Sequence, residues 1–326
     1  MNVLVTGGAG FIGSNLTQAL LADGARVTVL DNFSSGHRSN LQPQPGLSIV
    51  EGDIRNHALV DEVMRNVEMV FHLAASVGNR RAIENPVMDS DVNVLGTLKV
   101  LMAAKAHNVR KLVISSSAAV YGEPCRLPIR EDHPLDPQTP YACSKLAAET
   151  QSHAYRHLYG IEIVSLRYFN VYGQHQRYDA YGNVIPIFAR QILDGEPITI
   201  YGDGEQTRDF VHVDDVVAAN ISAANTKGLS GTFNIASGNV VSVNALTKVM
   251  LQHGTRRPPV LNGAERAGDV RHSSADIDAA RRGFNFRPKV GLEEGVARYM
   301  DWLTHHLTLP RTPERRPHTL EDRAHV

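Results

Sequence analysis

The sequence has few of the features that mark secreted, membrane-spanning or nucleic-acid-binding proteins. Its 326 residues include only two cysteines, Cys125 and Cys143, which indicates no disulfide framework and fits a reducing cytosol. The first apolar run, residues 3–5, is too short for a signal peptide, and no later run is long enough to span a bilayer. A net charge of −1 gives no broad attraction to nucleic acid or to an anionic membrane. No Cys/His cluster has zinc-ligand spacing, so we expect no metal and a cytoplasmic globular protein.

Short apolar runs rich in β-branched residues alternate with helical patterns through the first half of the chain. The runs that read as short buried strands are residues 2–6, 26–30, 47–50, 67–72, 111–115 and 162–167. The helical patterns include residues 11–22, 87–107 and 141–159. Apolar strands that alternate with helices predict a parallel sheet covered on both faces.

The pattern changes after about residue 170. Loops lengthen, and shorter elements are expected at residues 184–193, 198–201, 213–225 and 292–306. We therefore predict a first domain of residues 1–170 and a smaller mixed α/β lobe of residues 171–307, partly intertwined with the first. Residues 308–326 contain three prolines and many charges, which predicts a disordered tail.

A run of three glycines, Gly7, Gly10 and Gly13, lies between the first strand and the first helix. Glycines allow a tight turn and a close approach of backbone to a pyrophosphate, although a plain flexible turn is the alternative. The second strand ends at Asp31, whose carboxylate can accept from both ribose hydroxyls of NAD and would repel the extra phosphate of NADP. Asp53, after the third strand, is placed to meet the adenine. We predict a Rossmann-type doubly wound sheet that binds NAD.

Tyr141 and Lys145 lie one helical turn apart on the same face of a predicted helix. A free tyrosine has a pKa of about 10 and is a poor base at neutral pH. The ammonium of Lys145 is expected to favour the phenolate and lower the pKa of Tyr141. The pair would then be able to take a proton from an alcohol or sugar hydroxyl.

With this pair following that glycine loop, residues 1–302 resemble the extended short-chain dehydrogenase/reductase family, and within it the UDP-sugar 4-epimerases. The motifs that carry the resemblance are residues 72–75, 93–97, 115–122, 167–173, 208–212 and 266–269. The resemblance implies that Tyr141 is the base, that Lys145 also holds the nicotinamide ribose and that Ser117 hydrogen-bonds the reacting hydroxyl. It also implies a homodimer formed through helices 87–107 and 141–159.

The resemblance assigns two further sets of residues. Those on NAD-contacting positions are Gly7, Gly10, Phe11, Ile12, Gly13, Asp31, Asn32, Ser35, Gly36, Asp53, Ile54, Leu73, Ala74, Ala75, Asn93, Tyr141, Lys145 and Phe169. Those on UDP-sugar positions are Ser117, Tyr141, Asn170, Arg177, Asn183, Thr199, Tyr201, Arg208, Arg266, Asp269 and Ser273. An arginine fork suits a diphosphate, because it can bond two oxygens at once.

Residue type alone leaves alternatives at several of these positions. Ser115 or Ser116 could serve as well as Ser117, and a serine at a strand end can simply cap backbone. Arg208 stands beside Asp209, so a surface ion pair is the alternative to a phosphate contact. Arg266 stands beside Glu265 in the same way.

Ala118 and Ala119 bear on the reaction. Relatives that dehydrate a nucleotide sugar carry an acidic pair after the active-site serine or threonine, and relatives that decarboxylate UDP-glucuronate carry a glutamate two places after it. Alanine can neither protonate a leaving hydroxyl nor remove a C5 proton. The alanines favour a 4-epimerase over a decarboxylase or dehydratase, and a non-catalytic nucleotide-sugar sensor is the more distant alternative.

The identity of the sugar is left open by the sequence. Ser273 is small at a position where a tyrosine would restrict the pocket, which favours UDP-N-acetylglucosamine or a broad specificity. Arg177 lies where UDP-glucuronate 4-epimerases place an arginine against the carboxylate, but it could equally be a solvated charge. Arg80 and Arg81 lie in a second substrate loop, and Asn170 departs from the threonine expected in one group of uronate epimerases.

Overall fold

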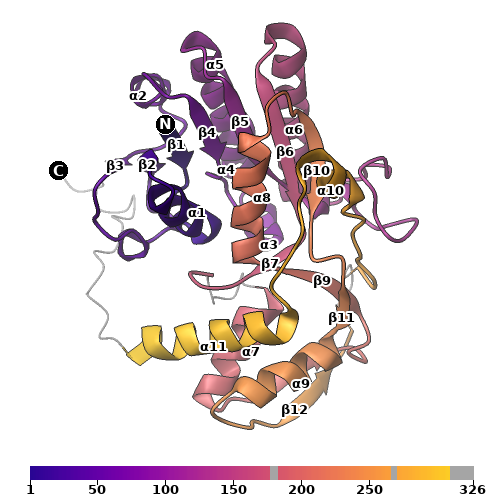
Figure 1. The fold of residues 1–326 in the computed structure, drawn as a ribbon. Helices are drawn as coiled ribbons and strands as arrows, with labels where there is room; N and C mark the ends of the chain where they lie inside the picture. The colour runs from indigo at the N-terminus through magenta and orange to yellow at the C-terminus, as the bar shows by residue number, and fades with distance from the viewer. Residues whose placement is uncertain (177–182, 266–269, 309–326) are drawn as a thin grey trace, which may run out of the picture.

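A seven-stranded parallel sheet forms the centre of the molecule (Figure 1). The computed structural model describes residues 1–176, 183–265 and 270–308. In spatial order the strands are β3 (Leu47–Glu51), β2 (Arg26–Asp31), β1 (Asn2–Thr6), β4 (Met69–His72), β5 (Lys111–Ser117), β6 (Glu162–Tyr168) and β10 (Gly231–Ile235). Every neighbouring pair is parallel. The predicted α/β doubly wound fold is confirmed.

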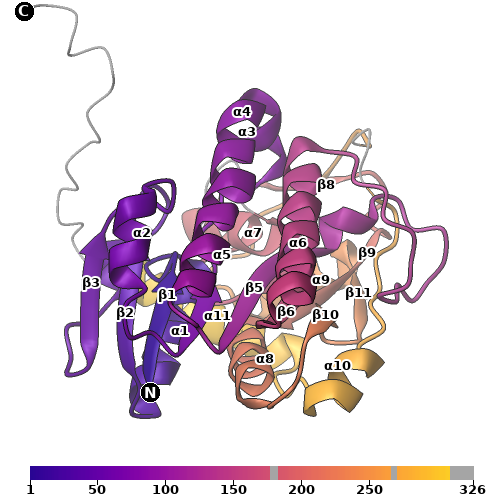
Figure 2. The same cartoon turned by 90° about the horizontal axis from the view of Figure 1, so that it is seen from above.

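Helices cover both faces of this sheet, because its central strands bury side chains on both sides. On one face, α1 (Phe11–Ala22) and α8 (Val213–Asn225) pack over Val3 and Val5. The other face is covered by α2 (His57–Val63), α5 (Thr97–Ala106) and α6 (Pro140–Tyr159) (Figure 2). These helices pack over the alternate residues of the strands, such as Leu4 and Leu112. Successive side chains of each strand point to opposite faces and therefore fill two separate cores.

The third strand differs from its prediction. Residues 47–50 read as a buried strand, but β3 has no fully buried residue, and Ser48 and Glu51 are exposed. β3 is the edge of the sheet and has only β2 beside it. An edge position is a property of the whole sheet, so a short run of apolar residues does not reveal it.

The long helix predicted for residues 87–107 is interrupted. It consists of α4 (Pro86–Ser90), a π-helical segment η2 (Asp91–Gly96) and α5. Within the widened turn, the hydroxyl of Thr97 donates to the Asn93 carbonyl at 2.6 Å. The π-helical segment re-aims one residue of the helix, and here it directs Asn93 into the protein, where only 2% of it is exposed.

The second half of the chain builds a smaller lobe that also returns to the central sheet. Its strands are β7 (Asn170–Tyr172), β8 (Ile198–Tyr201), β9 (Thr207–His212), β11 (Val240–Ser242) and β12 (Val260–Gly263). Its helices are α7 (Val184–Asp194), α9 (Val243–His253) and α11 (Leu292–Thr308), and these pack into a third core. Meanwhile β10 pairs with β6 and α8 packs on α1. The exact domain boundary and the tail remain predictions, and residues 309–326 lie outside the described residues.

Four shorter helical segments complete the part of the fold that the structure describes. These are η1 (Arg38–Asn40), α3 (Asn79–Glu84), η3 (Ala118–Tyr121) and α10 (Asp278–Phe284). Among the helices that the structure describes, none has the length and apolar character needed to cross a membrane.

Candidate active site

The glycine loop after β1 forms a cradle of closely packed backbone. A Cβ added to Gly13 would lie 2.1 Å from the Gly7 carbonyl oxygen, and one added to Gly36 would lie 2.7 Å from the Ala9 carbonyl carbon. Gly7 has a φ of +70°, which favours glycine. Gly10 is the N-cap of α1 and supplies no side-chain cap, so the first N–H groups of the helix are left for another acceptor. This arrangement fits the pyrophosphate of a dinucleotide.

Asp31 lies against this loop. Its carboxylate accepts from the Ala9 N–H at 2.9 Å and from the Phe33 N–H at 2.8 Å, and only 7% of the residue is exposed. Burial raises the pKa of Asp31, against the effect of the two backbone donors. Each oxygen retains a lone pair, so the carboxylate fits the ribose hydroxyls of NAD.

Asp53 is more heavily engaged than the sequence suggested. Arg55 donates to both of its oxygens, from Nε at 2.9 Å and from an Nη at 2.8 Å, and Asn32 donates to it at 2.8 Å. The hydrogen bond from Arg55 lowers the pKa of Asp53 to about 2. Arg55 also bonds Asp91 on η2 at 2.9 Å. The contact of Asp53 with adenine stays a prediction, and the arginine that orients it was missed.

The remaining residues predicted to contact NAD lie near the carboxyl ends of the sheet strands, as the glycine loop does. Ile54 is 4% exposed and packs against Gly96, so its backbone is the part that could meet a cofactor. The loop of residues 73–75 touches the cradle, since a Cβ on Gly7 would lie 2.6 Å from the Ala74 nitrogen. Ser35 is exposed beside Gly36, and Phe169 is buried between β6 and β7.

Three consecutive serines at the end of β5 bind three different residues of α6. Ser117 hydrogen-bonds the Tyr141 hydroxyl, while its Oγ accepts from the Ala119 N–H at 3.2 Å. The Lys145 ammonium instead donates to the Ser115 carbonyl at 3.0 Å and to its hydroxyl at 3.3 Å. The three serines that residue type left interchangeable are therefore distinct, and Ser117 is the one beside Tyr141.

Ser116 faces a buried network behind the pair. Its hydroxyl donates to Glu149 at 2.8 Å, and Glu149 forms a buried ion pair with Arg167. Arg167 also donates to the Tyr121 hydroxyl at 2.8 Å, and that hydroxyl bonds Asn234. Tyr121 and Arg167 lie inside motifs of the resemblance but had no assigned role, and Glu149 and Asn234 lie in no motif, because the network joins residues from different elements of the fold.

The expected lowering of the Tyr141 pKa is wrong for this structure. Burial raises the pKa of Tyr141 to about 12, although the hydrogen bond from Ser117 acts in the opposite direction. The reason is geometric, since the Lys145 ammonium is bonded to Ser115. Burial also lowers the pKa of Lys145 to about 8. Asp89, a fully buried carboxylate that no sequence motif indicated, acts on both groups.

Asn170 and Arg208 lie on two neighbouring strands of the smaller lobe, β7 and β9. The Asn170 amide donates to the Asp209 carbonyl at 3.1 Å, and Arg208 donates to the Thr207 carbonyl at 2.9 Å. The Asp209 carboxylate accepts from Ser237 and from the Gly238 N–H. The carboxylate of Asp209 is therefore already bonded to the loop of Ser237 and Gly238. This argues against an ion pair with Asp209 as the role of Arg208.

The other substrate positions lie around this region. Asn183 is the exposed N-cap of α7 and makes no cap bond with its side chain. Thr199 and Tyr201 belong to β8, and the Ser273 N–H donates to the Thr207 carbonyl at 3.1 Å. Arg177, Arg266 and Asp269 lie outside the described residues.

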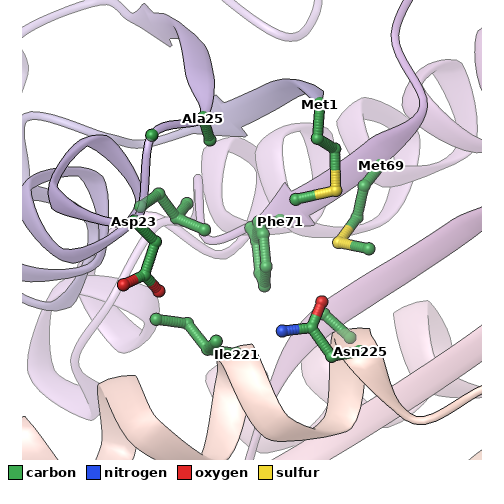
Figure 3. Close-up of a pocket in the computed structure, with 10 residues that line it drawn as sticks. Met1, Asp23, Ala25, Met69, Phe71, Ile221 and Asn225 are labelled. Atoms are coloured by element: carbon green, nitrogen blue, oxygen red, sulfur yellow. The ribbon is translucent and has the colours of Figure 1, made fainter.

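A separate cavity lies at the opposite end of the strands from the glycine loop. It has a volume of about 180 Å³ and is lined by residues that include Met1, Met69, Phe71 and Ile221 (Figure 3). Met1 precedes β1 and Met69 begins β4, so the cavity is at the amino ends of the strands. Ligands of open α/β sheets bind at the carboxyl ends, where Tyr141 and the glycine loop lie.

Comparison with known proteins agrees with this geometry. The chain is 38% identical over 308 residues to a UDP-glucose 4-epimerase of Mycolicibacterium smegmatis, and the match covers 93% of this chain and 98% of the relative. The structure of a UDP-N-acetylglucosamine 4-epimerase from Methanobrevibacter ruminantium M1 matches with a TM-score of 0.90 at 36% identity, over 94% of this chain and 98% of that one. That of a Thermus thermophilus UDP-glucose 4-epimerase complex with NAD matches with a TM-score of 0.84 at 37% identity, over 93% and 99%.

Relatives with other specificities also match. A UDP-glucuronate 4-epimerase of Thermodesulfobacterium geofontis is 33% identical, and a UDP-glucuronic acid decarboxylase of Danio rerio is 32% identical. The family model that matches residues 3–236 is described as the NAD dependent epimerase/dehydratase family. With its NAD cradle and its serine, tyrosine and lysine at the carboxyl edge of a doubly wound sheet, the chain belongs to this NAD-dependent family of enzymes.

Proposed function

We propose that this protein is a UDP-sugar 4-epimerase. The observation that carries the proposal is the composition of the site around Tyr141. Ser117 and Lys145 accompany it, while Ala118 and Ala119 occupy the places where an additional acid or base would be needed for dehydration or decarboxylation. Epimerisation needs only one proton donor and acceptor together with a reversible hydride acceptor, and the 4-epimerases among the relatives named above support that reaction.

The residues of this chain would act as follows. Tyr141, with its hydroxyl held by Ser117, takes the proton of the sugar 4-hydroxyl and later returns it. Bound NAD supplies the reversible hydride acceptor. Because the pKa of Tyr141 is raised in this structure, Tyr141 can act as a base only with a cation beside it; Lys145 is proposed to be that cation, with its ammonium moved from Ser115 towards Tyr141. Arg208 and Arg266 are proposed to hold the diphosphate, so that the flat 4-keto sugar can turn over while it stays bound.

The direct test is a nuclear magnetic resonance assay of C4 inversion with UDP-glucose, UDP-N-acetylglucosamine and UDP-glucuronate. We expect inversion of at least one sugar without release of carbon dioxide or water. Tyr141→Phe should lose the activity while keeping its fold and its NAD content. Release of carbon dioxide from UDP-glucuronate would favour the decarboxylase, and no reaction with any of the three would favour the sensor.

The sugar pocket is proposed to be roomy, because Ser273 is small. We expect UDP-N-acetylglucosamine to be accepted, and Ser273→Tyr should reduce its turnover more than that of UDP-glucose. Arg177 is proposed to contact a uronate carboxylate. If so, Arg177→Ala should lower the activity ratio of UDP-glucuronate to UDP-glucose, whereas Arg281→Ala, whose guanidinium bonds Asp278 on α10, serves as the comparison and should not change it. An unchanged ratio in Arg177→Ala would remove the carboxylate role.

A homodimer through α4, η2, α5 and α6 is proposed from the apolar side chains that these segments expose. Val87 is 79% exposed, Leu95 50% and Leu158 67%. A groove on α6 is lined by residues that include Leu146 and Ala147. Light scattering should give the mass of two chains for wild type and of one chain for Leu95→Glu. Val240→Glu is the matched control, because Val240 is 50% exposed on a different surface, and a monomeric wild type would contradict the proposal.

The cellular location is proposed to be the cytoplasm. Cys125 and Cys143 are both exposed and form no disulfide, which fits a reducing compartment.

A further inference from the structure

Asp89 is a fully buried carboxylate on α4, and its direct partners are neutral. It accepts from the Ser144 hydroxyl at 2.5 Å and from the Asn93 amide at 3.2 Å, and 0% of it is exposed. Carboxylates are rarely buried in this way unless a positive charge is close, since transfer of a charge out of water is costly. The buried cation in this region is Lys145.

Lys145 is a buried cation whose described hydrogen-bond partners are also neutral. It is 6% exposed, and its ammonium bonds only the neutral carbonyl and hydroxyl of Ser115 among the contacts described. An ammonium buried among neutral groups tends to lose its proton. Burial indeed lowers the pKa of Lys145, and the negative charge of Asp89 opposes that effect.

Ser144 links Asp89 to the helix that carries Tyr141 and Lys145. It lies between Tyr141 and Lys145 on α6, and its hydroxyl is 3.0 Å from the Tyr141 carbonyl as well as bonded to Asp89. Asn93, from the π-helical segment, donates to both Ser144 and Asp89. Asp89 is therefore fixed to the turn of α6 that carries the tyrosine and the lysine.

We propose that Asp89 is a positioning residue of this site, and that its buried carboxylate is the counter-charge that keeps Lys145 protonated beside Tyr141. This inference rests on the proposed function for its catalytic consequence, because a phenolate at Tyr141 requires a charged lysine. Its electrostatic content does not depend on the reaction, because it rests on the burial of both groups, on the Ser144 bond that holds Asp89 to α6 and on the effect of Asp89 on the pKa of Lys145.

The other groups that face these two residues do not replace Asp89. From β4, His72 faces Lys145, but burial lowers the pKa of His72 to about 3, so it stays neutral above that pH. From β5 the facing groups are the neutral Ser115 atoms, and on α6 it is Tyr141, which is protonated at neutral pH. The charged residues of α3, which packs on α4, are Arg80, Arg81 and Glu84, and Arg80 bonds Glu84 at the surface. On η2, which packs on α4 and α6, the charged residue is Asp91, and it is paired with Arg55.

The discriminating variants are Asp89→Asn, which removes the charge, and Asp89→Glu, which retains it. Asparagine can be accommodated, because the Ser144 hydroxyl can turn its proton to the Tyr141 carbonyl and accept from the new amide. Asp61→Asn is the matched control, since it removes a carboxylate that bonds His107 on the α2 side of the same face.

The first measurement is the titration of Lys145 by nuclear magnetic resonance of labelled lysine side chains, assigned with Lys145→Met. We expect the Lys145 midpoint to fall by about one pH unit in Asp89→Asn, and to be largely restored in Asp89→Glu. Asp61→Asn should leave it unchanged. Equal midpoints in wild type and Asp89→Asn would overturn the proposal, whether or not the protein is an epimerase.

The second measurement is the pH profile of turnover. The loss of activity at high pH should begin about one unit lower in Asp89→Asn, with KM changed less than about twofold. A purely structural role would instead lower activity equally at every pH. If Asp89→Asn does not fold, the carboxyl carbon resonance of Asp89 in wild type decides: it should sense the deprotonation of Lys145, and an Asp89 resonance that ignores Lys145 refutes the inference.

Discussion

Replacement of Gly13 by alanine should strongly weaken retention of NAD. The new Cβ would lie 2.1 Å from the Gly7 carbonyl oxygen and 2.8 Å from the Gly8 Cα, so backbone rather than a flexible side chain must move. The loop would have to open by roughly 1 Å, and such overpacking costs about 1–3 kcal/mol. If the cost falls on the conformation that binds the pyrophosphate, NAD affinity drops about 5- to 150-fold.

The assay is the NAD content of purified protein, released by denaturation, together with the Tm. Gly10→Ala is the graded comparison, because its Cβ would meet only the Gly7 oxygen at 3.2 Å, and it should lose less NAD. Gly291→Ala, where no atom lies within 4 Å of the added Cβ, should match wild type. Wild-type NAD content in Gly13→Ala would refute the argument that close backbone contact shapes the cradle.

Three further predictions concern buried groups of the site. Ser117→Ala should lower kcat about 10- to 100-fold with KM little changed, because a hydrogen bond that lowers the pKa of Tyr141 is lost; an unchanged kcat would contradict this. Glu149→Ala should destabilise the protein by about 3–5 kcal/mol in urea unfolding, since Arg167 is left buried without its partner, whereas Glu84→Ala at the surface should cost less than about 1 kcal/mol. His72, whose pKa burial lowers to about 3, stays neutral in the folded state while the unfolded state takes up protons below the ordinary histidine pKa of 6.5. Stability is therefore fully present above pH 6.5 and should fall by about 2 kcal/mol between pH 7 and pH 5, and His72→Gln should flatten that slope.

Most of the fold could be predicted from the sequence because its local signals agree with its tertiary arrangement. Apolar runs that alternate with helical patterns are buried on both faces, as the cores on either side of β1 demonstrate. The exceptions depend on distant contacts. The exposure of β3 follows from its edge position, and the π-helical turn at Asn93 follows from partners contributed by Ser76 and Asp89.

In the candidate site, too, residues that form local patterns could be predicted, and residues that depend on tertiary contacts could not. Glycines and the Tyr141–Lys145 spacing are visible in the chain because neighbouring residues create them. Asp89 and Glu149 were missed because each acquires its role from residues far along the chain. Arg55 was missed although its main partner, Asp53, is only two residues away, because residue type alone does not show that the two side chains bond. The pKa of Tyr141 could not be predicted either, since it depends on where the Lys145 ammonium points.

The contacts between β5 and α6 show that the three consecutive serines of β5 hold three different side chains of α6. Tyr141, Lys145 and Glu149 follow one another at intervals of four residues, and each bonds one of three consecutive serines. Four-residue spacing places the three side chains along one face of the helix, so the serines fix both its position and its rotation against the strand. A single-residue shift of α6 would break all three bonds together. The proton chemistry at Tyr141, the charge at Lys145 and the buried ion pair of Glu149 are therefore not independent features, and loss of the ion pair should disturb the geometry of Tyr141 even though Glu149 lies two helical turns away.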